Sequence, residues 1–144
     1  MLLTGDAEAE TEERLMSAGA NIKAKVLKVG HHGSRYASSE NFLRAGGFEA
    51  AIISDGEDNR YGHPSQDALD RLKSLGVKLY RTDLEGEVTI ISRGSGYEIK
   101  TERPASGDLW AGRTPPRGET ASLDSGDTES APSSKQSRRT AGRK

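Results

Sequence analysis

Short apolar runs alternate with longer segments of mixed polarity along the first 75 residues. The apolar runs have the length of strands and occupy residues 1–3, 26–29 and 50–53. The segments between them carry apolar residues at helical spacing, as at Leu69, Leu72 and Leu75, and end at glycines. Strands that alternate with helices predict an α/β fold whose strands are parallel.

From about residue 77 the pattern changes to strands without helices. The runs VKLYRT, EVTIIS and YEIKT are separated by short turns that contain glycine. We interpret them as an antiparallel meander that closes one edge of the sheet. The expected architecture is therefore a mixed sheet with helices on one face.

The composition divides the chain into two parts. Residues 1–103 carry the alternating pattern, whereas residues 104–144 are mostly Ser, Thr, Pro, Gly, Asp and Arg. In this second part only Leu109, Trp110 and Leu123 are large and apolar. So few apolar residues cannot offset the entropy of ordering the segment, so we predict one domain followed by a disordered polar tail.

The composition also restricts the chemistry. The chain has no cysteine, so any metal must be held by nitrogen and oxygen ligands. It has neither an apolar segment long enough to cross a membrane nor a signal peptide, which makes the cytoplasm the default location. Because Met1 opens directly into a strand, we expect the chain to be a fragment.

Candidate site residues follow the three apolar runs. Asp6 lies in LLTGD, His31 and His32 lie in KVGHHGS, and His63 lies in RYGHPS. The carboxyl ends of parallel strands meet at one edge of the sheet, so these turns should converge. A carboxylate and imidazoles together indicate a metal site. Adjacent residues in a turn seldom point the same way, so we expect only one of His31 and His32 to face it.

Each of these residues also has a structural alternative. Asp6 suits the N-cap of the helix that follows it. His31 and His32 suit hydrogen-bonded loop positions. With Pro64 at the first helical position, His63 would be an N-cap, where the helix dipole keeps the ring neutral.

Two neighbouring loops offer further polar groups. Ser34 and Tyr36 are suited either to bind a phosphate oxygen or to cap a loop. Asp55, Asp58 and Asn59 form an Asx-rich loop, and Asn59 precedes Tyr61 in the stretch NRYGHP.

Three segments in this order resemble the metallo-β-lactamase superfamily, and most closely the C-terminal hydrolase domain of ComEC-type competence proteins. They are LLTGDAE, AKVLKVGHHGSRYASSENFL and AAIISDGEDNRYGHPSQDALDRLKSLGVKLYRTDLEGEVTI. The resemblance covers about the first ninety residues.

The resemblance implies half of a four-layer αββα sandwich with one or two divalent metals, zinc or manganese, at its site. It makes Asp6 the bridging metal ligand and His63 the last histidine ligand. His31 and His32 become catalytic residues that bind metal or contact the scissile group. The implied substrate-binding residues are Ser34, Asn59 and Tyr61.

One expected motif is missing from the sequence. The superfamily's His-x-His-x-Asp-His turn belongs to the first half of the sandwich and does not occur here. The chain therefore resembles the second half of a hydrolase of DNA or another phosphodiester, with an upstream N-terminal half as its partner. The alternative is a non-catalytic remnant or accessory module of the same fold. As part of a full ComEC-like protein, it would be membrane-associated or extracytoplasmic.

Overall fold

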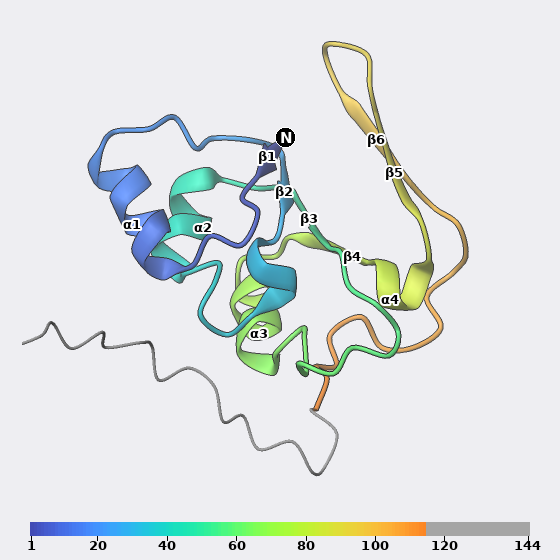
Figure 1. Ribbon diagram of the computed structural model, residues 1–144. Helices are drawn as coiled ribbons and strands as arrows, with labels where there is room; N and C mark the ends of the chain where they lie inside the picture. The colour runs from blue at the N-terminus through green and yellow to red at the C-terminus, as the bar shows by residue number, and fades with distance from the viewer. Residues whose placement is uncertain (115–144) are drawn as a thin grey trace, which may run out of the picture.

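The computed structural model describes residues 1–114 and contains a parallel sheet of four short strands (Figure 1). The strands lie side by side in chain order, as β1 (Leu2–Leu3), β2 (Val26–Lys28), β3 (Ala50–Ile53) and β4 (Lys78–Arg81). Because they are parallel, their carboxyl ends lie along one edge of the sheet. The α/β fold class expected from the sequence is confirmed.

Helices α1 (Ala9–Ser17), α2 (Glu40–Gly46) and α3 (Gln66–Ser74) lie together on one side of this sheet (Figure 1). Between them and the strands lies the main core, where Leu27, Ala51 and Leu79 of the strands meet Phe42 and Leu69 of the helices. Burying each large side chain contributes about 1.5–3 kcal/mol. Within residues 1–114, no helix has the length and apolar character needed to cross a bilayer.

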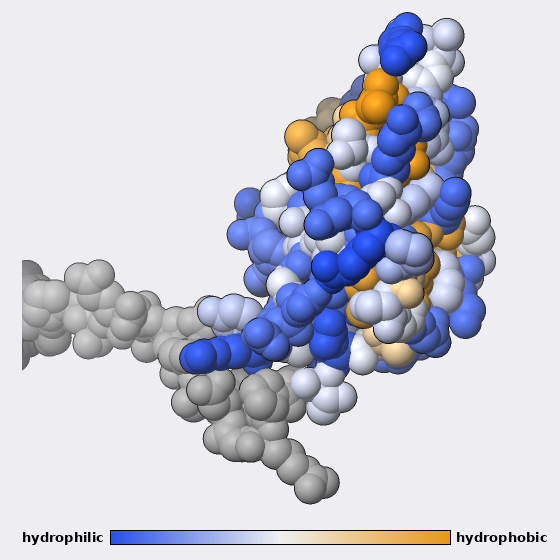
Figure 2. All heavy atoms as spheres, turned by 90° about the vertical axis from the view of Figure 1, so that its right-hand side faces the viewer, coloured by the Kyte–Doolittle hydropathy of each residue, from blue (hydrophilic) through white to orange (hydrophobic). Residues whose placement is uncertain are grey.

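A hairpin lies against the opposite face of the sheet. Its strands, β5 (Val88–Ser92) and β6 (Tyr97–Thr101), pair with each other in antiparallel register. A second, smaller apolar cluster joins the hairpin to the sheet, and it contains Val26, Ala50, Ile52, Tyr80, Val88, Ile90, Tyr97 and Ile99. Figure 2 shows this side of the molecule, with apolar side chains at the surface among polar ones.

The position of the hairpin corrects one sequence-based expectation. The sequence predicts that these strands extend the parallel sheet at its edge, but they form a separate two-stranded sheet. The cause is a short helix, α4 (Thr82–Glu85), which follows β4 and ends at Gly86 with a φ of 71°. The Glu85 carboxylate stabilises this turn by accepting a hydrogen bond of 2.7 Å from the main-chain N–H of Arg81.

Residues 108–113, which we call the C-terminal strap, lie on the body of the protein, although their composition predicts disorder. Leu109 and Trp110 are half-buried and pack against the main core. Residues 115–144 of the predicted tail lie outside the described residues.

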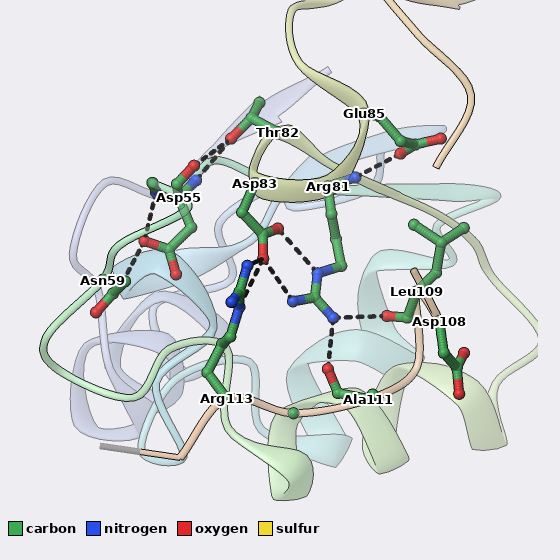
Figure 3. A network of polar contacts seen from close by, with 12 residues as sticks. Asp55, Asn59, Arg81, Thr82, Asp83, Glu85, Asp108, Leu109, Ala111 and Arg113 are labelled. Atoms are coloured by element: carbon green, nitrogen blue, oxygen red, sulfur yellow. Dashed lines mark hydrogen bonds and ion pairs between the residues drawn. The ribbon is translucent and has the colours of Figure 1, made fainter. Parts of the chain in front are cut away.

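A buried ionic network holds the strap in place (Figure 3). The side chain of Arg81 is 1% exposed and makes two hydrogen bonds to Asp83, of 3.0 and 2.7 Å. It also donates to the carbonyl oxygens of Leu109 and Ala111. Arg113 donates to Asp83 from the other side, at 3.1 and 2.9 Å. Composition alone could not predict that a buried arginine needs these strap carbonyls as acceptors.

Candidate functional site

A cavity of about 580 Å³ lies at the carboxyl ends of the first three parallel strands. Asp6 follows β1, the turn Gly30–Gly33 follows β2, and the loop that ends at His63 follows β3. The residues that line it are Asp6, His31, His32, Asp55, Gly56, Asp58, Asn59, Arg60, Tyr61 and His63. The structure therefore brings Asp6 and all three histidines to one cavity, as the strand order predicts. Their chemical roles stay predictions.

Main-chain hydrogen bonds join the three turns. The N–H of His31 donates to the carbonyl of Gly5 at 3.0 Å, and the N–H of Ser65 donates to that of Gly33 at 2.9 Å. Gly33 has a φ of 83°, and a β-carbon there would lie 2.7 Å from the Pro64 ring. Both the backbone angle and this close approach require glycine.

His31 and His32 both line the cavity, so the expectation that only one of them faces it is wrong. Both have positive φ, of 43° and 53°, and their ring centroids are 6.3 Å apart. Successive side chains in a helical conformation diverge by about 100°, rather than pointing to opposite sides as in a strand. Two consecutive left-handed residues can therefore direct both rings toward one space.

Each of these two rings has a hydrogen-bond partner at Nδ1. His31 Nδ1 lies 2.8 Å from a carboxylate oxygen of Glu8, and His32 Nδ1 lies 2.6 Å from the carbonyl oxygen of Ser54. The predicted alternative of hydrogen-bonded loop histidines is thus correct for one nitrogen of each ring. Among residues 1–114, these hydrogen bonds use Nδ1 and not Nε2 of either ring.

His63 is half-buried, and its ring centroid lies 5.5 Å from that of His31. Burial lowers the pKa of His63, and the nearby His31 lowers it further, while the negative charge of Asp55 opposes them. Its Nδ1 atom is buried and has no hydrogen-bond partner within the described part of the chain. A neutral ring with an unsatisfied nitrogen is the form of histidine that binds a metal.

The capping alternatives for Asp6 and His63 are wrong. Ser65 is the N-cap of α3, where its hydroxyl accepts a hydrogen bond of 3.3 Å from Ala68 N, so His63 and Pro64 both precede the helix. The N-cap of α1 is Glu8 rather than Asp6. Asp6 is instead exposed at the cavity.

The three predicted substrate-binding residues differ in position. Ser34 is 2% exposed, and its hydroxyl accepts a hydrogen bond from Tyr36 N at 3.3 Å, which favours the loop-capping alternative. Asn59 reaches the cavity, but its side chain already has partners. Its Nδ2 donates a hydrogen bond to the Asp55 carboxylate, and its Oδ1 accepts one from the main-chain N–H of Tyr61. Tyr61 is 82% exposed and stacks on His63, with ring centroids 6.3 Å apart. Tyr61 is thus the one of the three whose side chain is open to a substrate.

Sequence reasoning assigned no role at the site to Glu8, Arg60 or Asp55. In the sequence, Glu8 is one of several acids at the start of a helix, and Arg60 is an ordinary loop charge. The sequence pattern indicates for Asp55 only a place in an Asx-rich loop. Only the convergence of the turns places Arg60 and Asp55 at the cavity and Glu8 against His31.

The donors at the cavity are carboxylate oxygens and imidazole nitrogens, which suit zinc or manganese. The unsatisfied Nδ1 of His63 also fits a metal ligand. Among residues 1–114, however, no three His, Asp or Glu side chains are grouped closely enough to hold a metal ion. The donor chemistry fits a divalent metal, but more ligands are needed, because zinc takes about four and manganese about six.

Several bacterial competence and recombination proteins contain a segment similar to this chain. ComE operon protein 3 of Bacillus subtilis is 46% identical over 87 residues, which are 60% of this chain and 11% of that protein. Competence protein ComA of Neisseria gonorrhoeae is 40% identical over 105 residues, which are 72% of this chain and 15% of that protein. Recombination protein 2 of Haemophilus influenzae is 38% identical over 103 residues, 72% of this chain and 13% of that protein.

These similarities support the predicted relationship to competence proteins. The chain spans only 11% to 15% of the length of these three relatives. No family model matches the chain. No solved structure matches it either. The relationship to the metallo-β-lactamase superfamily therefore stays a prediction.

Proposed function

We propose that this chain supplies one half of the active site of a metal-dependent phosphodiester hydrolase within a larger competence-type protein. The observation that carries this proposal is the meeting of Asp6 with His31, His32 and His63 in one cavity at the ends of parallel strands. The lowering of the His63 pKa by burial and its unsatisfied Nδ1 support a metal ligand at this position. The names of the relatives support a role in competence, and we extend it to DNA uptake.

In this proposal Asp6 and His63 hold the metal, zinc or manganese. Asp6 is exposed at the cavity, and its carboxylate would be a metal ligand there. The Nδ1 contacts of His31 and His32 would leave Nε2 available to bind the metal or to contact the scissile group. Such a metal, when bound, polarises a phosphoryl oxygen and lowers the pKa of a coordinated water.

One cationic side chain at the cavity, and another outside its lining, support a phosphodiester as the substrate class. Arg60 lines the cavity, and Arg35 is close enough for its charge to lower the pKa of His63. Guanidinium groups bind phosphate through two parallel hydrogen bonds. Arg60 and Arg35 would orient the phosphate, with Tyr61 at the mouth of the cavity.

The remaining ligands are proposed to come from an upstream half that bears the His-x-His-x-Asp-His turn. The small share of each relative that this chain matches is consistent with such an additional segment. In a full ComEC-like protein, we place the assembled hydrolase at the membrane or outside the cytoplasm.

The second candidate is a non-catalytic module of the same fold. The observation that favours it is the lack of a three-ligand group within residues 1–114. The two candidates differ in whether adding the upstream half increases the affinity for a divalent metal.

Calorimetric titration with manganese and with zinc separates these candidates. We expect weak binding by the 144-residue chain and tighter binding by a single polypeptide that joins it to an upstream half with His-x-His-x-Asp-His. Asp6→Asn and His63→Gln should each weaken binding by the joined protein more than about tenfold. Glu13→Gln, on the exposed side of α1, is the matched control. Equal affinity of the chain, the joined protein and its variants would refute the shared metal site.

A further inference from the structure

Glu8 lies at the start of α1 with its side chain directed to the neighbouring turn. It occupies the N-cap position, yet its carboxylate makes no capping hydrogen bond. One carboxylate oxygen instead lies 2.8 Å from Nδ1 of His31. The contact joins the segment after β1 to the turn after β2, 23 residues apart in the chain. It thus links two of the three turns that form the cavity.

This contact determines which nitrogen of His31 carries the proton. An ionised carboxylate has no hydrogen to donate, so Nδ1 of His31 must be the donor. In the neutral ring, Nε2 then keeps its lone pair. Without such a partner, a histidine side chain in water favours the opposite tautomer, in which Nε2 carries the proton and cannot bind a metal.

His32 provides an internal comparison. Its Nδ1 lies 2.6 Å from the main-chain carbonyl oxygen of Ser54, which also accepts only. The two adjacent rings are therefore held in the same tautomer by different means. A side-chain substitution can remove the partner of His31 but leaves that of His32 in place.

We infer that Glu8 is a positioning residue of the cavity, which holds His31 in the Nδ1–H tautomer so that Nε2 offers its lone pair. The consequence for catalysis rests on the proposed function, whereas the tautomer itself does not. A carboxylate that accepts a hydrogen bond from the Nδ1–H of a metal-binding histidine fixes both the tautomer and the orientation of the ring. Since the side chains of Glu8 and His31 are 42% and 40% exposed, their contact contributes little to stability. The role of Glu8 is therefore geometric.

The test is a long-range ¹H–¹⁵N correlation spectrum of the 144-residue chain with labelled histidines. The spectrum is recorded at about pH 9, well above the pKa of about 6.5 of histidine in model peptides, and the two ring-nitrogen shifts report the tautomer. We expect His31 and His32 of the wild type both to show a protonated Nδ1. In Glu8→Ala, His31 should shift toward the Nε2–H form while His32 stays unchanged.

Two further variants complete the experiment. Glu8→Gln keeps an acceptor oxygen and should retain the wild-type tautomer, whereas Glu13→Ala on the same helix should have no effect. The inference is overturned if His31 has a protonated Nε2 in the wild type, or if Glu8→Ala leaves its nitrogen shifts unchanged. It is also overturned if the ring-nitrogen shifts of His32 change as much as those of His31 in Glu8→Ala, because Glu8 would then act on the whole turn.

A second readout uses the joined protein. Glu8→Ala should lower kcat/KM for phosphodiester hydrolysis about ten- to a hundredfold, and Glu8→Gln should restore most of it. Full activity of Glu8→Ala would overturn the positioning role. Inactivity of every joined protein, the wild type included, would overturn the proposed hydrolase function, while the tautomer spectra would still decide the role of Glu8.

Discussion

The main-chain N–H of Arg113 donates a hydrogen bond of 2.9 Å to the carbonyl oxygen of Pro64. Pro64 directly follows His63, so this bond attaches the C-terminal strap to the wall of the cavity. The side chain of Arg113 also bonds Asp83, which in turn pairs with Arg81 at the end of β4 (Figure 3). The strap therefore supports the turn that carries a predicted metal ligand.

Trp110 is the only tryptophan and lies in this strap, so it reports whether the strap is docked. Because it packs against the main core, we expect its fluorescence to shift to the red in the same urea transition that far-UV circular dichroism detects. Leu109→Ala should move both transitions together to lower urea. Emission typical of a solvated indole under native conditions would contradict the docked strap.

Replacing Asp83 tests the buried ionic network. Asp83→Asn leaves the charge of Arg81 uncompensated inside the protein, which we expect to lower the free energy of unfolding by about 3–5 kcal/mol. The control is Glu57→Gln, which removes an exposed ion pair with Arg103 and should cost less than about 1 kcal/mol. Urea denaturation measures both. Equal small effects would mean that the network contributes no more than a surface pair.

The same carboxylate predicts a dependence of stability on pH. Burial alone would raise the pKa of Asp83, but the hydrogen bonds from Arg81 and Arg113 outweigh it and lower the pKa. The pair therefore stabilises the fold fully above the unfolded pKa of about 3.9, and this stabilisation is lost as the pH falls toward the folded pKa and through it. The difference in unfolding free energy between the wild type and Asp83→Asn should shrink below about pH 4. A constant difference between pH 6 and pH 2 would contradict this linkage.

Glu12 is fully buried in α1 and accepts hydrogen bonds from the main-chain N–H groups of Ser38 and Ser39, at 2.6 and 2.8 Å. Glu12→Ala leaves both donors without this acceptor, and a buried unpaired donor costs about 1–3 kcal/mol. We expect thermal and urea denaturation to show a loss of this size or larger. The neighbouring Glu13→Ala should stay within about 0.5 kcal/mol, because Glu13 is exposed. Similar losses in the two variants would refute the role of Glu12.

The titration of His63 tests the electrostatics of the cavity. Burial, and then His31, lower its pKa below the ordinary 6.5, so NMR should show a midpoint below that value. Asp55 opposes this shift, so Asp55→Asn should lower the midpoint further. Because the folded ring binds a proton less readily than the unfolded one, its contribution to stability should fall as the pH drops below about 6.5. A midpoint at or above 6.5 would contradict the burial of His63.

The convergence of Asp6 and His63 was predictable because it depends on strand order and on the turns that follow apolar runs. These are local patterns, and the parallel sheet turns them into a shared edge. The tautomers of His31 and His32 were not predictable, because they depend on Glu8 and on a main-chain carbonyl that are distant in the sequence.

The path of the chain after β4 was not predictable for a similar reason. The segment TDLE has the length of a turn, and its helical form depends on Glu85 reaching back to Arg81. The docking of the strap likewise depends on Arg81, whose buried side chain requires the carbonyls of Leu109 and Ala111. Composition describes average polarity and does not show where one buried charge needs acceptors.

Hydrolysis of single-stranded DNA with added manganese or zinc tests the central proposal most directly. The comparison is between the 144-residue chain and the protein that joins it to an upstream half with His-x-His-x-Asp-His. We predict metal-dependent cleavage by the joined protein alone, abolished by Asp6→Asn or His63→Gln and retained in Glu13→Gln. Robust cleavage by the 144-residue chain, or full activity of the joined Asp6→Asn and His63→Gln variants, would contradict the account.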